Sequence, residues 1–396
     1  MKAKWPTVRL DECCEIVSGA TPRTSNDEYW DGDIYWATPK DLSDLDGAYI
    51  SDTPRKLTRS GLESCAAAIL PAGSVLFSSR APIGHVAINT IPMATNQGFK
   101  SFVPKTDKIH AKFLYYWLRT KRSYLESLGN GATFKEVSKS VISRVKIALP
   151  PLEEQRRIAD ILDRAEALRA KRRAALAQLD ELTEAVFIEM FGDPVANPKG
   201  WQCVLLGKYT TKIGSGATPT GGESAYKKSG ISLIRSLNVR DGEFTYKDLA
   251  FIDEQQARKL ANVQVEENDV LLNITGASVA RVCRVPKTIL PARVNQHVSI
   301  IRPNSNLNFI FLEQLLLSPS MKRKLLRISG AGATREAITK AQLEEFEVIL
   351  PPLILQKEFA HRIATMEKLK AVHKASLAEL DELFASLQHR AFRGEL

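Results

Sequence analysis

The chain has 396 residues, of which 44% are hydrophobic, and a formal net charge of +10 at neutral pH. This length predicts two domains, and the excess of basic residues favours a polyanionic partner such as nucleic acid. No apolar run approaches the roughly 18 residues that a membrane-spanning helix needs, which argues against a membrane protein.

The cysteines and the N-terminal residues indicate the compartment. No C-x-x-C pair occurs, so a zinc site is not expected, and unpaired thiols suit a reducing compartment. The first ten residues, MKAKWPTVRL, do not resemble a signal peptide. We therefore predict a cytoplasmic protein with no metal and no cofactor. The cysteines are Cys13, Cys14, Cys65, Cys203 and Cys283.

Residues 1–151 are predicted to form a first globule of helices and strands. The loop at 18–22, SGATP, contains small hydrogen-bonding residues that can approach another surface closely. Segment 75–89, VLFSSRAPIGHVAIN, has two apolar strands about a turn with proline and glycine, which predicts a β-hairpin with Arg80 at its tip. A helix is predicted over 109–128, and a last strand leads to residue 149.

Residues 152–191 are predicted to form one long helix. Pro150 and Pro151 suit a helix start, and Gly192 suits its end. Forty residues would give a rod of roughly 60 Å, and its apolar residues alternate three and four apart, as in a coiled coil. A surface helix packed on one domain is the alternative. The predicted seam is Ile158, Ile161, Ala165, Leu168, Arg172, Ala175, Leu179, Leu182 and Val186.

The second half of the chain repeats the first at an offset near 200 residues. SGATP recurs at 215–219, Asn-Gln at 295–296, LPPL at 350–353 and LDEL at 380–383. A period of this length indicates a domain duplication rather than a solenoid. We therefore predict a second globule over 192–351, with a helix at 308–329, and a second long helix over 352–396. Its predicted seam is Phe359, Ile363, Met366, Leu369, His373, Leu377, Leu380, Leu383 and Leu387.

The basic charge is concentrated in the two globules. Lys and Arg exceed Asp and Glu by five in residues 1–151 and by six in 192–351, whereas 152–191 carries −2 and 352–396 carries +1. This distribution is expected if the globules contact a polyanion.

No catalytic or cofactor motif was found. The sequence has no G-x-x-x-x-G-K-[ST] phosphate loop, no H-E-x-x-H and no G-x-S-x-G, and its six histidines are scattered. It also lacks the Asn/Asp-Pro-Pro-aromatic motif of amino-methyltransferases. We predict no catalytic residue, no metal ligand and no enzymatic activity for this chain.

Taken together, these residues resemble a known family. Two globules, each followed by LPPLxxQ and a long helix containing LDEL, together with SGATP, YWATPKDL (35–42) and MFGDPVANPKGW (190–201), are similar to the specificity (S) subunit of type I restriction–modification systems. The resemblance implies a non-catalytic subunit whose globules each read one half of a bipartite DNA sequence. It also implies helices that set the gap and dock two methyltransferase (M) subunits, joined in the full enzyme by two restriction/translocase (R) subunits.

The predicted fold follows from the repeat and the resemblance. Domain termini usually lie close together, so the second long helix should run back along the first. We predict an α+β fold in which two similar globular target recognition domains are separated by two long helices. These helices form an antiparallel coiled coil with pseudo-twofold symmetry. The predicted boundaries are 1–151, 152–191, 192–351 and 352–396.

Polar side chains in equivalent loops of the two globules are the candidate DNA contacts. Phosphate contacts would supply most of the affinity and contacts to base edges the specificity. Divergence of these loops between the globules suits two different half-sites. The candidates in the first globule are Thr38, Lys40, Arg80, Asn96 and Gln97. Those in the second are Arg235, Asn238, Arg240, Asn273, Arg281, Asn295 and Gln296.

Two other functions stay open from the sequence alone. The chain could be a nuclease whose site no motif reveals, or a scaffold that holds two protein partners with its basic charge incidental. Magnesium-dependent cleavage by the single chain would favour the first, and absence of DNA binding would favour the second.

Overall fold

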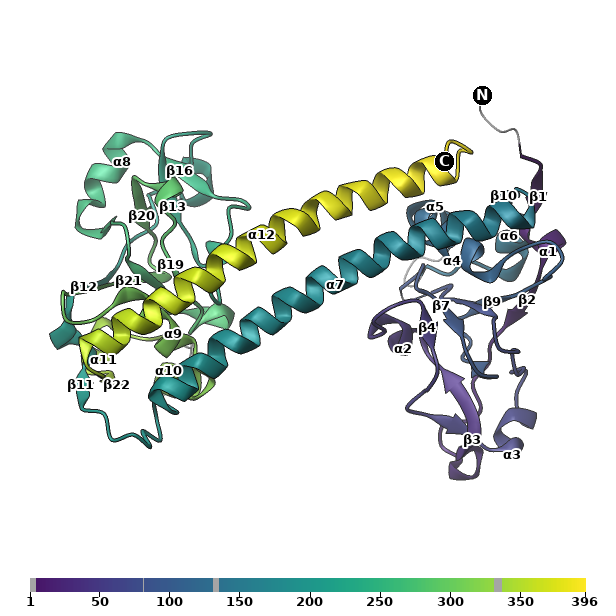
Figure 1. The fold of residues 1–396 in the computed structure, drawn as a ribbon, viewed down its shortest axis with the longest axis horizontal. Helices are drawn as coiled ribbons and strands as arrows, with labels where there is room; N and C mark the ends of the chain where they lie inside the picture. Colours follow the sequence, from purple (N-terminus) through teal and green to yellow (C-terminus); the bar gives the residue numbers. More distant parts are fainter. Residues whose placement is uncertain (1–4, 81, 131–134, 331–336) are drawn as a thin grey trace. The chain divides into compact units, whose positions relative to one another are not determined.

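The computed structural model describes all residues except 1–4, 81, 131–134 and 331–336 (Figure 1). The chain divides into two compact units, residues 1–173 with 375–396, and residues 174–374. Each unit therefore contains one globule and part of each long helix. Within the described residues, no helix is both long enough and apolar enough to span a membrane.

The two long helices are α7 (Leu152–Phe191) and α12 (Leu353–Ala391). Gly192, with a φ of +78°, takes the left-handed conformation that ends α7. In the first unit Arg157 donates to the Leu396 carbonyl at 3.0 Å, and Arg169 to the Asp381 carboxylate at 2.6 Å. Residue numbers rise along α7 as they fall along α12, so the predicted antiparallel packing is confirmed.

Four of the eighteen predicted seam residues are displaced by one position. The seam prediction is wrong for Leu168, Leu182, Leu369 and Leu383, which are 51%, 46%, 47% and 49% exposed. The next residue along each helix faces the partner helix instead, as Thr183 does after Leu182.

Two of the residues that face the partner helix instead, Arg169 and Lys370, are basic and pack through amphipathic stems. In the first unit the Arg169 guanidinium lies 4.4 Å from the centroid of the Phe384 ring. In the second unit Lys370 donates to the Thr183 hydroxyl at 3.1 Å and pairs with Asp180 at 2.7 Å. Long basic side chains can bury their methylene stems while the charged end keeps a partner, which a pattern of apolar residues does not predict.

Among the described residues, the first globule contains two larger sheets and the two-stranded sheet β1-β10. One larger sheet has the strand order β2-β9-β6-β7-β4 and the other the order β5-β3-β8, in which β3 and β8 run parallel. The predicted hairpin is confirmed as β6 and β7, with Val75 opposite Ile88. The strands are β1 (Thr7–Arg9), β2 (Cys14–Ser18), β3 (Trp30–Ala37), β4 (Tyr49–Ile50), β5 (Lys56–Leu57), β6 (Val75–Phe77), β7 (Val86–Asn89), β8 (Ala94–Thr95), β9 (Lys100–Pro104) and β10 (Lys146–Ala148).

Short helices cover these sheets and lead to α7. The helix predicted over 109–128 is two helices, α4 and α5, which meet at Lys121. Strands β1 and β10 pair and close the globule next to the start of α7. The helices are α1 (Leu10–Cys13), α2 (Pro39–Ser43), α3 (Arg59–Glu63), α4 (Ala111–Thr120), α5 (Arg122–Ser127) and α6 (Lys139–Ser143).

The second globule repeats this plan. Its two four-stranded sheets have the orders β12-β21-β18-β19 and β16-β13-β20-β17, and β13 and β20 again run parallel. Strands β11 and β22, and β14 and β15, form two-stranded sheets. The strands are β11 (Cys203–Leu205), β12 (Thr210–Ser215), β13 (Ile231–Ile234), β14 (Val239–Arg240), β15 (Glu243–Phe244), β16 (Ala250–Ile252), β17 (Gln264–Val265), β18 (Val270–Asn273), β19 (Val282–Arg284), β20 (Ala292–Val294), β21 (Val298–Pro303) and β22 (Glu347–Ile349).

The helix predicted over 308–329 is also broken in two. Ser318 ends the first part, because Pro319 cannot donate the backbone hydrogen bond that would continue it. The helices are α8 (Glu254–Lys259), α9 (Phe309–Leu317), α10 (Pro319–Gly330) and α11 (Lys340–Glu344). The α+β fold with two repeated globules and two long helices is therefore confirmed.

The ends of the long helices belong to the cores of the globules. In the first unit Phe384 and Ala391 of α12 are 5% and 0% exposed within the core, and the Phe113 and Phe392 rings lie 5.4 Å apart. In the second unit the Phe191 ring lies 4.9 Å from Phe311 of α9 and 5.3 Å from Phe359 of α12. Each globule therefore packs on segments of both helices.

Candidate nucleic-acid interface

The glutamine of each LPPLxxQ motif joins a globule to a long helix. Gln155 is fully buried; its carbonyl oxygen accepts from the His110 backbone N–H at 2.8 Å, and its amide donates to the carbonyls of Lys108 and Pro150. Gln356 is also fully buried, accepting from the Asn308 N–H and donating to a proline carbonyl, both at 2.8 Å. Both glutamines thus hold the start of a long helix against the start of α4 or α9.

Gln155→Ala and Gln356→Ala are each expected to lower the free energy of unfolding by about 2 kcal/mol. Each change leaves buried backbone groups without a hydrogen-bond partner, and such a group costs roughly 1–3 kcal/mol. Denaturant unfolding of the full chain measures the effect. The matched control is Gln178→Ala, since Gln178 is exposed on α7 and its loss should cost under about 0.5 kcal/mol. Equal stability of all three variants would contradict the joining role.

Three loops converge where the parallel strands of the first globule end. Thr38 follows β3 and Asn96 follows β8, and the Asn96 N–H donates to the Ala37 carbonyl at 3.0 Å. The SGATP loop lies against them, because a Cβ on Gly19 would come within 2.4 Å of the Thr95 carbonyl oxygen.

Arg80 reaches the same place. A Cβ on Gly98 would meet the side chains of Asn96, Pro39 and Arg80, at 3.0, 3.0 and 3.6 Å. Thr38, Arg80, Asn96 and Gln97 therefore lie on loops that are in direct contact, and Lys40 lies in the first turn of α2.

The second globule has the same loop arrangement. Asn295 follows β20, and its N–H donates to the Ile234 carbonyl of β13 at 3.0 Å. A Cβ on Gly216 of the second SGATP loop would come within 1.8 Å of the Val294 carbonyl oxygen. Only glycine allows this approach, so the recurring SGATP motif has a structural explanation.

A hydrogen bond between two of the repeated motifs occurs in both globules. The Thr21 hydroxyl donates to the side-chain carbonyl of Gln97, and the Thr218 hydroxyl donates to that of Gln296. The sequence did not identify the two threonines as site residues. The signal that could have identified them is that SGATP and Asn-Gln recur together at nearly the same offset.

The candidates differ in how far they are exposed. Lys40, Gln97, Arg240 and Gln296 are exposed, and Thr38, Arg80, Asn96, Arg235 and Arg281 are half-buried. Asn238, Asn273 and Asn295 are buried. As DNA contacts, all twelve residues stay a prediction.

The buried asparagines make hydrogen bonds inside the globule. The Asn238 amide donates to the carbonyls of Thr245 and Lys247, and the Asn273 amide donates to the Ser236 carbonyl at 2.9 Å. The exposed and half-buried candidates are therefore the residues that a bound duplex can reach.

Two candidate arginines have protein partners. Arg80 lies 3.8 Å from Glu136, which also pairs with Lys100 at 3.1 Å. Arg235 pairs with Glu223 at 3.1 Å and donates to the Asp248 carbonyl at 2.6 Å. The carboxylates of Glu136 and Glu223 can hold these cations in place, and a phosphate or a base edge would compete for the same N–H groups.

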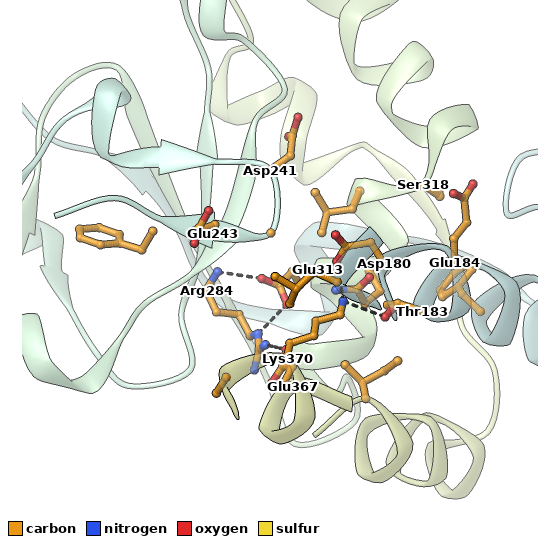
Figure 2. A pocket seen from close by; sticks show the side chains of 18 of the residues that line it. Asp180, Thr183, Glu184, Asp241, Glu243, Arg284, Glu313, Ser318, Glu367 and Lys370 are labelled. Atoms are coloured by element: carbon orange, nitrogen blue, oxygen red, sulfur yellow. Dashed lines mark hydrogen bonds and ion pairs between the residues drawn. The ribbon is translucent and has the colours of Figure 1, made fainter. Parts of the chain in front are cut away.

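A cavity of about 830 Å³ lies within the second unit (Figure 2). Six carboxylates and three basic side chains line it, so it does not suit DNA phosphates. Figure 2 shows Arg284 of β19 between Glu313 of α9 and Glu367 of α12. Burial raises the pKa of the Glu313 carboxyl, and the Arg284 guanidinium only partly offsets this. The cavity marks the junction of globule and helices rather than the candidate interface.

Comparison with known proteins identifies the family. The model of the type I restriction modification DNA specificity domain matches residues 2–178 and 198–382. The chain belongs to this family. The type I restriction enzyme MjaIX specificity subunit of Methanocaldococcus jannaschii is 32% identical over 378 residues, covering 89% of this chain and 84% of that protein. The EcoBI specificity subunit of Escherichia coli is 26% identical over 341 residues, covering 77% and 70%.

Solved structures support the fold. The S subunit of a type I system from M. genitalium has a TM-score of 0.60 with 14% identity, covering 98% of this chain and 96% of that one. A chain from a type I restriction–modification assembly has a TM-score of 0.58 with 22% identity, covering 99% and 98%. As a type I specificity subunit, this chain has a role in DNA sequence specificity and is not the catalytic subunit of its system.

Proposed function

We propose that each globule of this specificity subunit reads one half of a bipartite DNA sequence. The observation that carries the proposal is the recurrence of one loop framework with different side chains. Thr38 and Arg235 occupy equivalent positions, because the backbone N–H of each donates to a side-chain oxygen of the residue three positions further along, Asp41 at 2.7 Å and Asn238 at 3.0 Å. Different polar groups on one framework suit two different base sequences.

Within the same proposal, the two long helices set the gap between the half-sites. Two similar readers related by a pseudo-twofold axis would bind half-sites at a fixed spacing, as dimeric DNA-binding proteins do. We place this complex, with two M subunits on the helices and two R subunits in the full enzyme, in the cytoplasm.

Mapping of methylated adenines in DNA from cells that express the chain with its M subunit tests this function. The expected result is a single motif of two short specific halves separated by a fixed number of unspecified base pairs. Methylation at one continuous site would contradict bipartite recognition. Magnesium-dependent cleavage by the purified chain alone would favour a nuclease, and absence of DNA binding by the assembled complex would favour a scaffold.

The exposed leucines of the long helices are the proposed docking residues for the M subunits. Leu168 and Leu369 are equivalent at an offset of 201 residues, as are Leu182 and Leu383, and all four are about half exposed. Exposed leucines at the same places on both helices suit a contact that occurs twice, once for each M subunit.

Leu168→Asp combined with Leu369→Asp is expected to weaken binding of the M subunit by about tenfold or more. A charge in place of an apolar anchor must be desolvated on binding, whereas in the free subunit it stays in water. Titration of the M subunit, followed by light scattering or calorimetry, gives the affinity. The matched control is Ala177→Asp with Ala378→Asp, an exposed equivalent pair that lies half a turn around each helix from the first leucines. Equal affinity of the leucine variant and the control would contradict docking at these leucines.

A further inference from the structure

We propose that Gln97 and Gln296 contact the DNA backbone rather than the bases, and that Thr21 and Thr218 are positioning residues for these contacts. The inference rests on the proposed function and assigns one part of the interface to sequence-independent binding. It concerns the Asn-Gln loops after β8 and β20.

Each glutamine keeps at least one amide N–H group without a partner among the described residues. Gln97 and Gln296 are exposed, and the side-chain carbonyl of each accepts from the threonine of the SGATP loop. In the second globule the Gln296 amide nitrogen also lies 3.0 Å from the His297 ring, and an amide nitrogen carries two N–H groups. The groups left over are therefore donors, and phosphate oxygens are acceptors only.

The loops that carry the glutamines are fixed at both ends. The preceding asparagines bind the backbone of the neighbouring strand, and their side-chain oxygens accept from the N–H of Gly98 at 2.8 Å and of His297 at 3.0 Å. The threonine then fixes the far end of each glutamine side chain. A side chain held in one geometry before binding loses little conformational entropy when it contacts DNA.

The repetition of this element argues against a role in base recognition. The globules differ at a neighbouring position, which holds Arg80 in the first globule and Thr275 in the second. These two residues are equivalent because each forms a β-bridge with a residue just before a short helix, Glu136 before α6 and Ala337 before α11. Two domains that read different half-sites need different groups at base edges. A group that is the same in both domains suits the part of DNA that is the same at every step, the sugar-phosphate backbone.

The test measures DNA binding by the full chain assembled with its M subunits. Fluorescence anisotropy gives the affinity for a duplex with the methylated motif and for a scrambled duplex. Gln97→Ala with Gln296→Ala is expected to weaken binding to both duplexes equally, by about tenfold, because hydrogen bonds common to both complexes are lost. The methylated motif and the melting temperature should not change.

The threonines are tested by a double-mutant cycle. Thr21→Val with Thr218→Val keeps the side-chain shape, and we expect a loss of about threefold on both duplexes. Adding these changes to the glutamine variant should cost nothing further, because the threonines act only through the glutamines. A purely structural role would instead lower the melting temperature and leave the losses additive.

Three outcomes are informative. Unchanged affinity of the glutamine variant would overturn the proposal, and so would a change in the methylated motif at any base. If the unaltered complex does not prefer its own motif over the scrambled duplex, the proposed function fails, whatever the variants do. Arg80→Ala is the contrasting variant, expected to reduce preference for the motif.

Discussion

When residues 1–173 and 375–396 are replaced together by those of another family member, the complex of the hybrid chain with its M subunits is expected to methylate a target with one new half and one unchanged half. These two segments form one compact unit, so the exchange keeps the contacts of the incoming globule with both long helices. The second unit, residues 174–374, retains its own loops and should keep its half-site. Mapping of methylated adenines gives both halves in one experiment.

Exchange of residues 1–151 alone provides the control. It would place a foreign core against Phe384 and Ala391, which are 5% and 0% exposed, and against Phe392, whose ring lies 5.4 Å from Phe113. Misfit in a packed core costs roughly 1–3 kcal/mol, so this hybrid should melt lower than the two-segment hybrid. A changed sequence in both halves, for either hybrid, would show that the globules do not read independently.

The repeat and the long helices could be predicted from the sequence because both are encoded locally. The two prolines before each helix and Gly192 after the first are separate local signals, and the helices begin at Leu152 and Leu353. The repeated motifs likewise predicted two globules with one plan.

The contacts between the two long helices, between a globule and a helix, and between distant loops could not be predicted in the same way. Leu168 was assigned to the seam, but Arg169 lies there instead. A pattern of apolar residues cannot show that the Arg169 side chain contacts both the Phe384 ring and the Asp381 carboxylate. Gln155 was noted only as part of a motif, since its partners at 108 and 110 are more than forty residues away. Similarly, the bond between Thr21 and Gln97 spans 76 residues.

The positions of the site loops were predicted better than the roles of their residues. Asn238 and Asn273 were chosen as polar residues in loops that differ between the globules, but both amides bind backbone carbonyls inside the globule. Sequence alone does not distinguish a polar residue that stabilises a turn from one that faces DNA, because both uses favour the same residue types.

The ion-pair network at the junction of the second globule and the helices gives the largest predicted stability effect. The Arg284 guanidinium donates to Glu313 at 2.5 Å and also binds Glu367, and the Arg284 backbone N–H donates to Glu313 at 3.0 Å. The Glu313 side chain is 2% exposed and that of Arg284 is 24% exposed. Arg284 therefore neutralises a buried carboxylate and connects β19 and α9 to α12 (Figure 2).

Arg284→Ala is expected to lower the free energy of unfolding by about 3 kcal/mol, because it leaves the Glu313 charge buried without its partner. In a unit of this size the loss corresponds to roughly 10 °C in Tm. Arg59→Ala is the matched control, since the Arg59–Glu63 pair is 74% and 63% exposed and should contribute under about 0.5 kcal/mol. The double variant Arg284→Met with Glu313→Leu should recover most of the stability, because apolar residues then replace the whole pair.

The deficit of Arg284→Ala is expected to depend on pH. Burial already raises the pKa of Glu313, and loss of the guanidinium should raise it further. The folded variant then binds a proton more tightly than the unfolded chain, so stability is greatest below the ordinary glutamate pKa and falls as pH rises through the folded pKa. Denaturant unfolding from about pH 5 to about pH 8 should therefore show a deficit that grows with pH, relative to the unaltered chain. A deficit that is constant over this range would mean that the loss comes from packing of the arginine stem rather than from the buried charge.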